Sequence, residues 1–148
     1  MENITVQISQ SPEDIARCHE IRRVVFIEGQ GVDAALEVDG RDPLCTHILA
    51  WDGDQLLGCA RMRLVDGYAK AERVAVLSSS RGKGIGRVLM RALEAEAQRQ
   101  GCSKVKLAAQ VPVVAFYERI GYTAHGDVFM EAGIAHRWMT ILLEGSAA

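Results

Sequence analysis

The chain lacks the long apolar run that a membrane-spanning helix needs, since stretches such as Val111 to Phe116 are far too short. It also lacks a basic N-terminal segment followed by an apolar stretch, so we expect no secretory signal and a cytoplasmic location. Only four cysteines are present, widely spaced and without a C-x-x-C pair. We therefore expect buried, reduced thiols and no disulfide framework, zinc site or other bound metal.

Neither sign of charge predominates, because 17 basic side chains stand against 19 acidic ones, for a net charge of −2. Such a chain has no broad basic field, which argues against nucleic acid or a membrane surface as its partner. Any site for an anion must therefore be local. Low-complexity linkers and internal repeats are also missing, and 49% of the 148 residues are hydrophobic. We expect one globular domain over residues 1–148.

Hydrophobic periodicity and turn residues predict an alternation of strands and helices. Strands are expected over 3–9, 45–51, 55–65, 68–77, 104–109, 122–130 and 135–143, and helices over 12–27, 84–100 and 113–120. Ser11 and Pro12 are typical of a helix start, since serine caps the first turn and proline suits the first helical position. Residues 29–43 predict a long acidic loop with room for a short helical turn. This order of elements favours an α/β domain with a mixed sheet.

A glycine-rich segment, RGKGIG at residues 81–86, lies between a predicted strand and an amphipathic helix. Glycine lets a ligand approach the backbone closely, and a helix start presents unpaired N–H groups at its positive end. With Arg81, Lys83 and Arg87 alongside, the segment predicts a site for a diphosphate. The alternative is a loop that only turns the chain. The G-x-x-x-x-G-K-S/T order of a P-loop and the third glycine of a dinucleotide fingerprint are both missing.

Three segments together resemble the GNAT superfamily of acyl-CoA N-acyltransferases. Residues 81–86 match its Q/R-x-x-G-x-G/A signature, Val74-Ala75-Val76 is similar to its V-x-V strand, and FYERIGY at residues 116–122 is similar to its F-Y-x-x-x-G-F/Y segment. The resemblance implies the GNAT fold, a mixed and mainly antiparallel sheet of six to seven strands with flanking helices and a central β-α-β crossover. It also implies acetyl-CoA as the donor and an amine of a small molecule or protein as the acceptor.

The resemblance assigns the binding of coenzyme A to a set of mainly backbone groups. The diphosphate is expected on Arg81, Gly82, Lys83, Gly84, Ile85, Gly86 and Arg87, the pantetheine arm on Val74, Ala75 and Val76, and a further polar contact on Gln110. A pantetheine arm carries two amides, and the open edge of a strand supplies their hydrogen-bond partners. The amide of Val74 is expected to donate to the thioester oxygen as it becomes an oxyanion.

The same resemblance makes Tyr117 the general acid that protonates the departing thiolate of coenzyme A. A phenol with a pKa of ~10 stays neutral at physiological pH and can donate to a thiolate whose pKa is ~8.5. The alternative is that Tyr117 packs in the core beside Phe116. Because neighbouring residues of a helix point about 100° apart, we expect one ring in the core and the other, Tyr117, toward the cofactor.

The sequence leaves open which general base takes a proton from the amine. Glu72 is the first candidate, because strand alternation places it on the same face as Val74 and Val76. A solvated or salt-bridged Glu72 is the alternative. His136 and His47 are the second and third candidates, although a histidine on a half-buried strand is more often structural. A water relay without a dedicated base is a further option.

Three acids of the predicted loop, Glu37, Asp39 and Asp42, lie where GNAT proteins vary their acceptor site. They are expected either to bind a cationic amine or to form a solvated acidic loop. Competing interpretations of the chain are a non-catalytic acyl-CoA sensor and a nucleotide-binding regulatory domain. Direct transfer in a ternary complex is expected, because neither Cys59 nor Cys102 has a neighbouring histidine that would activate it as an acyl carrier. The resemblance leaves a homodimer open.

Overall fold

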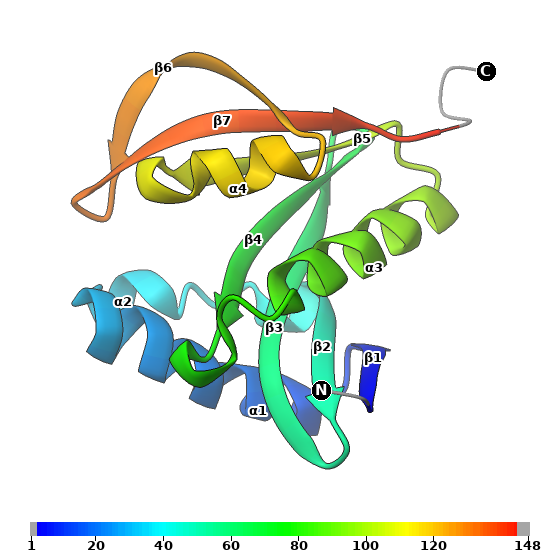
Figure 1. The fold of residues 1–148 in the computed structure, drawn as a ribbon, viewed down its shortest axis with the longest axis vertical. Helices are drawn as coiled ribbons and strands as arrows, with labels where there is room; N and C mark the ends of the chain where they lie inside the picture. Colours follow the sequence, from blue (N-terminus) through cyan, green and yellow to red (C-terminus); the bar gives the residue numbers. More distant parts are fainter. Residues whose placement is uncertain (1–2, 145–148) are drawn as a thin grey trace.

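Seven strands form one mixed sheet in the computed structural model, which describes residues 3–144 apart from the side chains of residues 35 and 36 (Figure 1). The strands are β1 (Ile4–Ser9), β2 (Thr46–Asp52), β3 (Gln55–Val65), β4 (Tyr68–Val76), β5 (Lys104–Gln110), β6 (Thr123–Glu131) and β7 (Ile134–Leu142). Their order across the sheet is β1-β2-β3-β4-β5-β7-β6. The pair β4 and β5 is parallel, whereas the other neighbours are antiparallel. The predicted mixed, mainly antiparallel α/β sheet is confirmed.

The α-helices of the described chain are α1 (Pro12–Arg22), α2 (Ala34–Glu37), α3 (Ile85–Arg99) and α4 (Val114–Arg119). The cap of α1 is the predicted one, because the Ser11 hydroxyl accepts a hydrogen bond of 3.2 Å from the N–H of Asp14. This helix ends earlier than predicted, and Arg23–Glu28 continue it as a π-helical segment. The predicted loop at 29–43 contains α2 as its short helical turn. The predicted crossover runs from β4 through α3 to β5.

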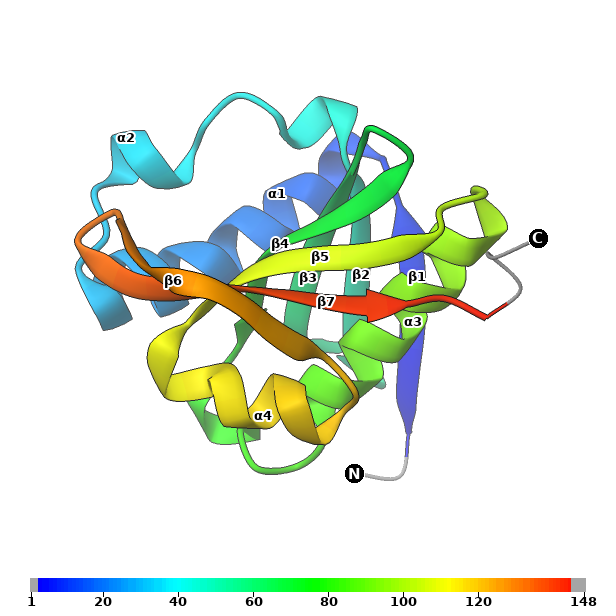
Figure 2. The same cartoon turned by 90° about the horizontal axis from the view of Figure 1, so that it is seen from above.

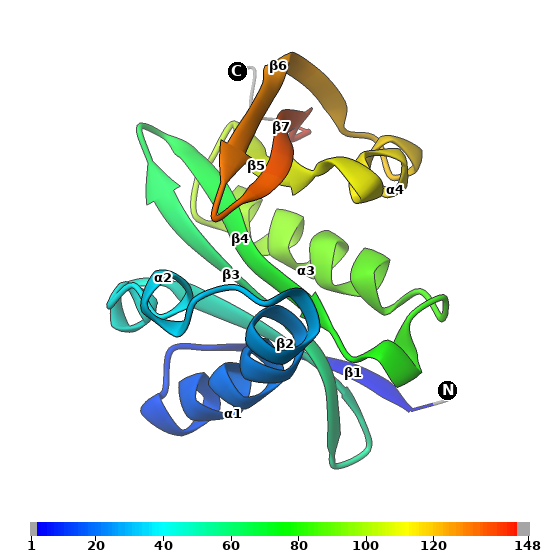
Figure 3. The same ribbon diagram turned by 90° about the vertical axis from the view of Figure 1, so that its left-hand side faces the viewer.

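Helices lie on both sides of the sheet, with α1 and α2 on one side and α3 and α4 on the other (Figure 3). The larger core forms between α3 and the sheet and includes Ile48, Leu89, Leu93, Val105 and Met139. A smaller core under α1 includes Cys18, Ile21, Leu49 and Cys59. All four cysteines are buried free thiols, as predicted. None of the helices within residues 3–144 is long and apolar enough to cross a membrane.

Candidate active site

The parallel strands β4 and β5 are paired over a short stretch and then separate (Figure 1), and Figure 2 shows the same two strands from above. The paired residues are Ala69, Lys70 and Ala71 in β4 with Val105, Lys106 and Leu107 in β5. Among the described strands, none pairs with the β5-facing edge of residues 72–76. The backbone groups of such an edge need partners, and a chain that contains amides can supply them. The separation of β4 and β5 therefore opens a binding edge in the middle of the sheet.

A β-bulge interrupts β4 where this free edge begins. Arg61 of β3 lies opposite Glu72, but Cys59, only two residues before it, lies opposite Ala75, so β4 contains one extra residue. Arg73 takes a positive φ of 55°, which is uncommon for any residue other than glycine. The bulge turns the second half of β4 relative to the first.

The bulge overturns the prediction that Glu72 shares a face with Val74 and Val76. One inserted residue moves all later side chains to the opposite face of the strand. Val74 and Val76 pack against the larger core, on the side of α3. Ala75 packs in the smaller core under α1. Glu72 lies on the α1 side as well, because it faces Arg61 across the ladder.

The glycine loop leaves the backbone open at two of its three glycines. Gly82 and Gly84 have φ values of 78° and 82°, and a Cβ added to either would meet no atom within 4 Å. Gly84 is the N-cap of α3, and no side chain caps the free N–H groups of its first turn. The exposed side chains of Arg81, Lys83 and Arg87 surround this positive helix end. The loop therefore has the geometry of an anion site.

The third glycine, Gly86, also has a packing role. A Cβ added there would lie 3.0 Å from Cζ of Phe116, so Gly86 lets α4 pack closely on α3. The neighbouring Ile85 side chain is buried in the larger core. At both positions the backbone N–H groups alone can contribute to an anion site.

Tyr117 lies deeper in the protein than its neighbour Phe116. It is 7% exposed, whereas Phe116 is partly buried, which reverses the predicted placement of the two rings. Tyr117 contacts Phe116 and Tyr122 edge to face, with ring centroids 5.0 and 5.6 Å away. Burial raises the pKa of the Tyr117 phenol well above its usual value. Within residues 3–144 its hydroxyl has no hydrogen-bond partner, so a neutral donor is kept in an apolar setting.

His136 has a defined tautomer and lies on the β5 side of the opening. Its Nδ1 donates a hydrogen bond of 2.7 Å to the carbonyl of Ile134, which leaves Nε2 as an acceptor. Nε2 lies 3.9 Å from the Glu131 carboxylate. His136 is also paired with Gln110 in the ladder between β5 and β7. Nε2, on a side chain that is 6% exposed, is therefore the ring nitrogen that can accept a proton beside the end of β5.

Gln110 is joined to Gln30, which ends the 22–30 segment expected to vary with the acceptor, although no pairing between the two glutamines was predicted. The amide groups of Gln110 and Gln30 exchange two hydrogen bonds, of 2.9 and 3.0 Å. Gln30 follows the π-helical segment, which packs beside β4, so the pair connects the two sides of the opening. The Gln110 amide can form a hydrogen bond with a ligand only after one of its two hydrogen bonds with Gln30 breaks.

Three acids of the 29–43 segment, Glu37, Asp39 and Asp42, belong to an ion-pair network in which Glu37 and Asp42 are buried, so the predicted solvated acidic loop is wrong. The network joins five cations of the described chain (Arg22, Arg61, Arg63, Lys70 and Arg73) to four carboxylates (Glu37, Asp39, Asp42 and Glu72). Arg22 binds Glu37 in the two-pronged geometry that a guanidinium favours, with both groups almost fully buried. The segment is thereby attached to α1, β3 and β4.

The carboxylates of this network are held in their charged form. A hydrogen bond from Arg61 is the main cause that lowers the pKa of Asp39. Burial opposes the ionisation of Asp42, but hydrogen bonds from Arg22 and His19 outweigh it and lower its pKa. Glu72 contacts three cations, Arg61 at 2.9 Å, Arg63 at 3.1 Å and Lys70 at 2.9 Å, and its pKa is lowered despite burial. Glu72 is therefore a weak proton acceptor.

His47 lies at the edge of the same network and is 1% exposed. Its Nε2 donates a hydrogen bond of 2.9 Å to the Asp42 carbonyl, and its Nδ1 has no partner among the described residues. Because His47 is enclosed under α1, it has no route to a substrate in the opening.

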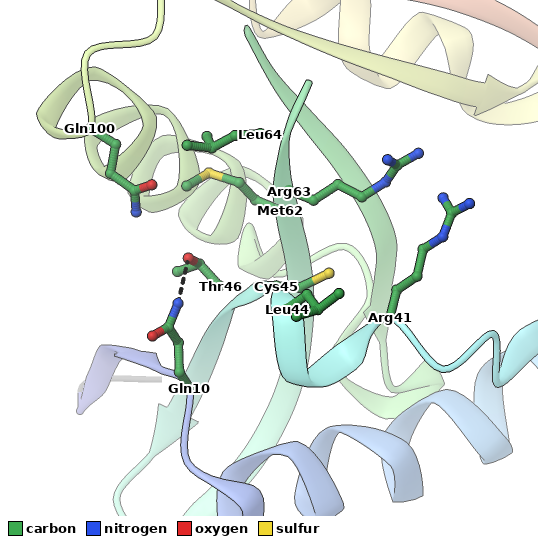
Figure 4. A pocket seen from close by; sticks show the side chains of 9 residues that line it. All are labelled: Gln10, Arg41, Leu44, Cys45, Thr46, Met62, Arg63, Leu64 and Gln100. Carbon is green, nitrogen blue, oxygen red and sulfur yellow. Dashed lines mark hydrogen bonds between the residues drawn. The ribbon is translucent and has the colours of Figure 1, made fainter. Parts of the chain in front are cut away.

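A surface depression of about 560 Å³ lies at the opposite end of α3 from the glycine loop (Figure 4). Its lining residues are Gln10, Arg41, Leu44, Cys45, Thr46, Met62, Arg63, Leu64 and Gln100. The 15 residues of α3 separate it from the loop by about 22 Å. It is therefore distinct from the opening between β4 and β5.

Comparisons with known proteins agree with this geometry. The model of the Acetyltransferase (GNAT) family matches residues 13–122. YjcF, an uncharacterized N-acetyltransferase of Bacillus subtilis, is 38% identical over 133 residues, which cover 89% of this chain and 95% of YjcF. The crystal structure of an acyl-CoA N-acyltransferase from Pseudomonas aeruginosa is similar with a TM-score of 0.81 and 29% identity, covering 93% of this chain and 98% of that one. A GNAT acetyltransferase from Elizabethkingia anophelis with acetyl-CoA bound shares the fold, with a TM-score of 0.72, 16% identity, and coverage of 97% and 100%. The chain belongs to the GNAT family of acetyltransferases.

Proposed function

We propose that the protein transfers the acetyl group of acetyl-CoA directly to a primary amine of a small molecule or protein, within a ternary complex. The observation that carries this proposal is the unpaired edge of residues 72–76, which leads directly into the glycine loop and α3. A free strand edge offers partners to the amides of a pantetheine arm, and a helix start offers N–H groups to a diphosphate. Acetyl-CoA contains these two parts in the same order.

Each step of the transfer then has a candidate group beside the opening. The N–H of Val74 donates to the thioester oxygen as negative charge develops on it. The buried phenol of Tyr117 stays protonated and donates its proton to the departing thiolate. We assign the general base to Nε2 of His136 rather than to Glu72, because three cations hold the Glu72 carboxylate. The reaction written in this way needs no metal.

We extend the proposal to a single domain that acts in the cytoplasm. Four buried free thiols are suited to a reducing compartment, where disulfides are rare. A homodimer is outside the proposal, because none of these steps uses a group from a second chain.

Thermal unfolding with and without acetyl-CoA tests the proposal. At one hundred times its dissociation constant, a ligand of the folded state adds about 2.7 kcal/mol of stability. For a chain of this size the expected rise in Tm is about 5–11 °C. Wild-type protein that shows no rise at saturating acetyl-CoA would refute the proposal.

Two substitutions of one glycine locate the diphosphate. Gly84→Asn and Gly84→Asp both tolerate the left-handed backbone, but only aspartate places a negative charge beside the diphosphate. We expect the asparagine variant to keep most of the rise in Tm and the aspartate variant to lose it. Equal rises in both variants would place the diphosphate elsewhere.

A further inference from the structure

The face of β4, β5, β6 and β7 that is turned away from α4 carries a group of rings and lysines, and we call it the open face. Its members are Tyr68, Lys70, Lys104, Lys106, Phe129, His136 and Trp138. Strand alternation explains this placement, because Val105 and Leu107 enter the larger core and the lysines between them point the opposite way. Figure 3 shows α3 and α4 on the far side of these strands.

The rings of the open face form a continuous row. Phe129 stacks on His136 and on Trp138, with ring centroids 5.8 and 5.5 Å apart. Nζ of Lys106 lies 5.5 Å from the ring centroid of Trp138 and 4.9 Å from that of Tyr68. A cation held between two rings loses part of its hydration, so it binds an anion more strongly than a fully solvated lysine does.

This row begins where β4 and β5 separate. Lys106 is paired with Lys70 in the last stretch of parallel ladder, next to the pair that ends it. At the other end of the row, His136 is paired with Gln110 across the ladder between β5 and β7. The open face therefore borders the opening along β5, on the side of the sheet opposite α4.

The charges of the open face favour an anion. Lys70 binds Glu72, whereas neither Lys104 nor Lys106 forms an ion pair within residues 3–144. On the neighbouring segment, Asp39 is bound by Arg61 and Arg73 in the ion-pair network. Glu131, 3.9 Å from His136, and the exposed acids Asp66 and Asp127 form no ion pair with lysine or arginine within residues 3–144. The charge that lies against the rings is therefore the positive charge of Lys104 and Lys106.

We propose that the acceptor is an amine that also carries a carboxylate or phosphate next to an aromatic or apolar part. Lys106 and Lys104 bind the anionic group, and the rings of Trp138 and Phe129 cover the apolar part. The amine then lies toward His136, which takes its proton. This inference rests on the proposed acetyl transfer and names the class of its second substrate.

Three amines of the same skeleton test the inference: phenylalanine, its neutral amide and phenethylamine, with spermidine as a polycation. Release of coenzyme A thiol gives kcat/KM for each compound. We expect phenylalanine to exceed phenethylamine by about tenfold, and spermidine to be the poorest. Lys106→Gln should remove that tenfold preference, mainly by raising the KM for phenylalanine. Arg99→Gln, at the exposed end of α3, is the control for loss of one surface cation.

A binding measurement separates this inference from the proposed function. In a Trp51→Phe variant, Trp138 is the single remaining tryptophan, and its fluorescence reports on the open face. We expect N-acetylphenylalanine to change this signal at lower concentration than N-acetylphenethylamine, and Lys106→Gln to abolish the difference. Equal titrations, or a preference for spermidine, would overturn the inference even if acetyl-CoA still raises Tm. An unchanged Tm with acetyl-CoA would overturn the proposed function instead.

Discussion

Replacing Arg61 by methionine tests whether the buried ion-pair network holds the 29–43 segment in place. The Arg61 side chain is 1% exposed and contacts Asp39 at 2.6 Å, Glu72 at 2.9 Å and Asp42 at 3.1 Å. Methionine keeps much of the apolar stem of arginine and removes the guanidinium, so packing changes little. The variant leaves buried carboxylates with fewer cations around them.

The expected loss of stability follows from the partners that remain. Removing one member of a buried ion pair costs about 3–5 kcal/mol, because the other charge stays buried. Here Asp42 keeps Arg22 at 2.7 Å and Glu72 keeps Lys70 at 2.9 Å, so we expect the lower end of that range. For a chain of this size, about 3 kcal/mol corresponds to a fall in Tm of about 6–12 °C at pH 7.

The loss of stability in Arg61→Met must also change with pH, and the direction of that change follows from the pKa values of the carboxylates. The wild-type pKa values of Asp39, Asp42 and Glu72 lie below those of the unfolded chain, so their contribution to stability is complete only above about pH 5.5 and is lost as the pH falls further. Without Arg61 the pKa values of these carboxylates rise in the folded state. The folded variant then takes up protons at higher pH than the wild type does. The difference between their free energies of unfolding therefore shrinks as the pH falls from about 8 to about 5.

Urea unfolding of both proteins over this pH range measures the deficit. Arg63→Met is the matched control, because Arg63 also binds Glu72 but has a 28% exposed side chain, and its loss should cost less than about 1 kcal/mol. A deficit for Arg61→Met below about 1 kcal/mol at pH 7, or one that is constant with pH, would refute the account of a buried charged network.

Three further changes examine the site. Tyr117→Phe should lower kcat at least tenfold and leave the KM for acetyl-CoA unchanged, since only the proton donor is lost; equal kcat in steady-state assays would remove Tyr117 from the reaction. Gly86→Ala should lower stability by about 1–2 kcal/mol through the contact with Phe116, whereas acetyl-CoA should still raise its Tm; loss of the ligand effect at unchanged stability would contradict the packing role. Gln30→Ala should release Gln110 and change the affinity for acetyl-CoA measured by calorimetry, and identical affinity together with an unchanged KM for the amine would show that the pair controls neither substrate.

The sequence predicted the elements of the fold because their signals are local. The Ser11 cap, the apolar stripe of α3 and the turn residues between strands each depend on neighbours a few positions away. The family resemblance of three short segments then indicated the glycine loop and the crossover, and the fold agrees with both.

The parts of the site that the sequence did not predict depend on contacts between distant residues. Arg22, Arg61 and Arg73 meet the acids of the 29–43 segment only after folding, so nothing in that segment marks its acids as already paired. Gln30 and Gln110 are 80 residues apart. The bulge had no signal either, because arginine at a positive φ is rare and no glycine or asparagine marked the position.

The extra residue in β4 also determines how that strand tolerates insertions and deletions. Before Arg73, the polar side chains of β4 (Tyr68, Lys70 and Glu72) lie on the α1 side of the sheet. After Arg73, Val74 and Val76 pack on the α3 side. Deletion of Arg73 would shorten β4 by one residue and remove the bulge. Every later residue up to the glycine loop would then face the opposite side of the sheet. Val74 and Val76 would lie in the polar region, and Ala75 would lie in the core that the valines now fill. The register of the unpaired edge of residues 72–76 is thus set by one residue, Arg73.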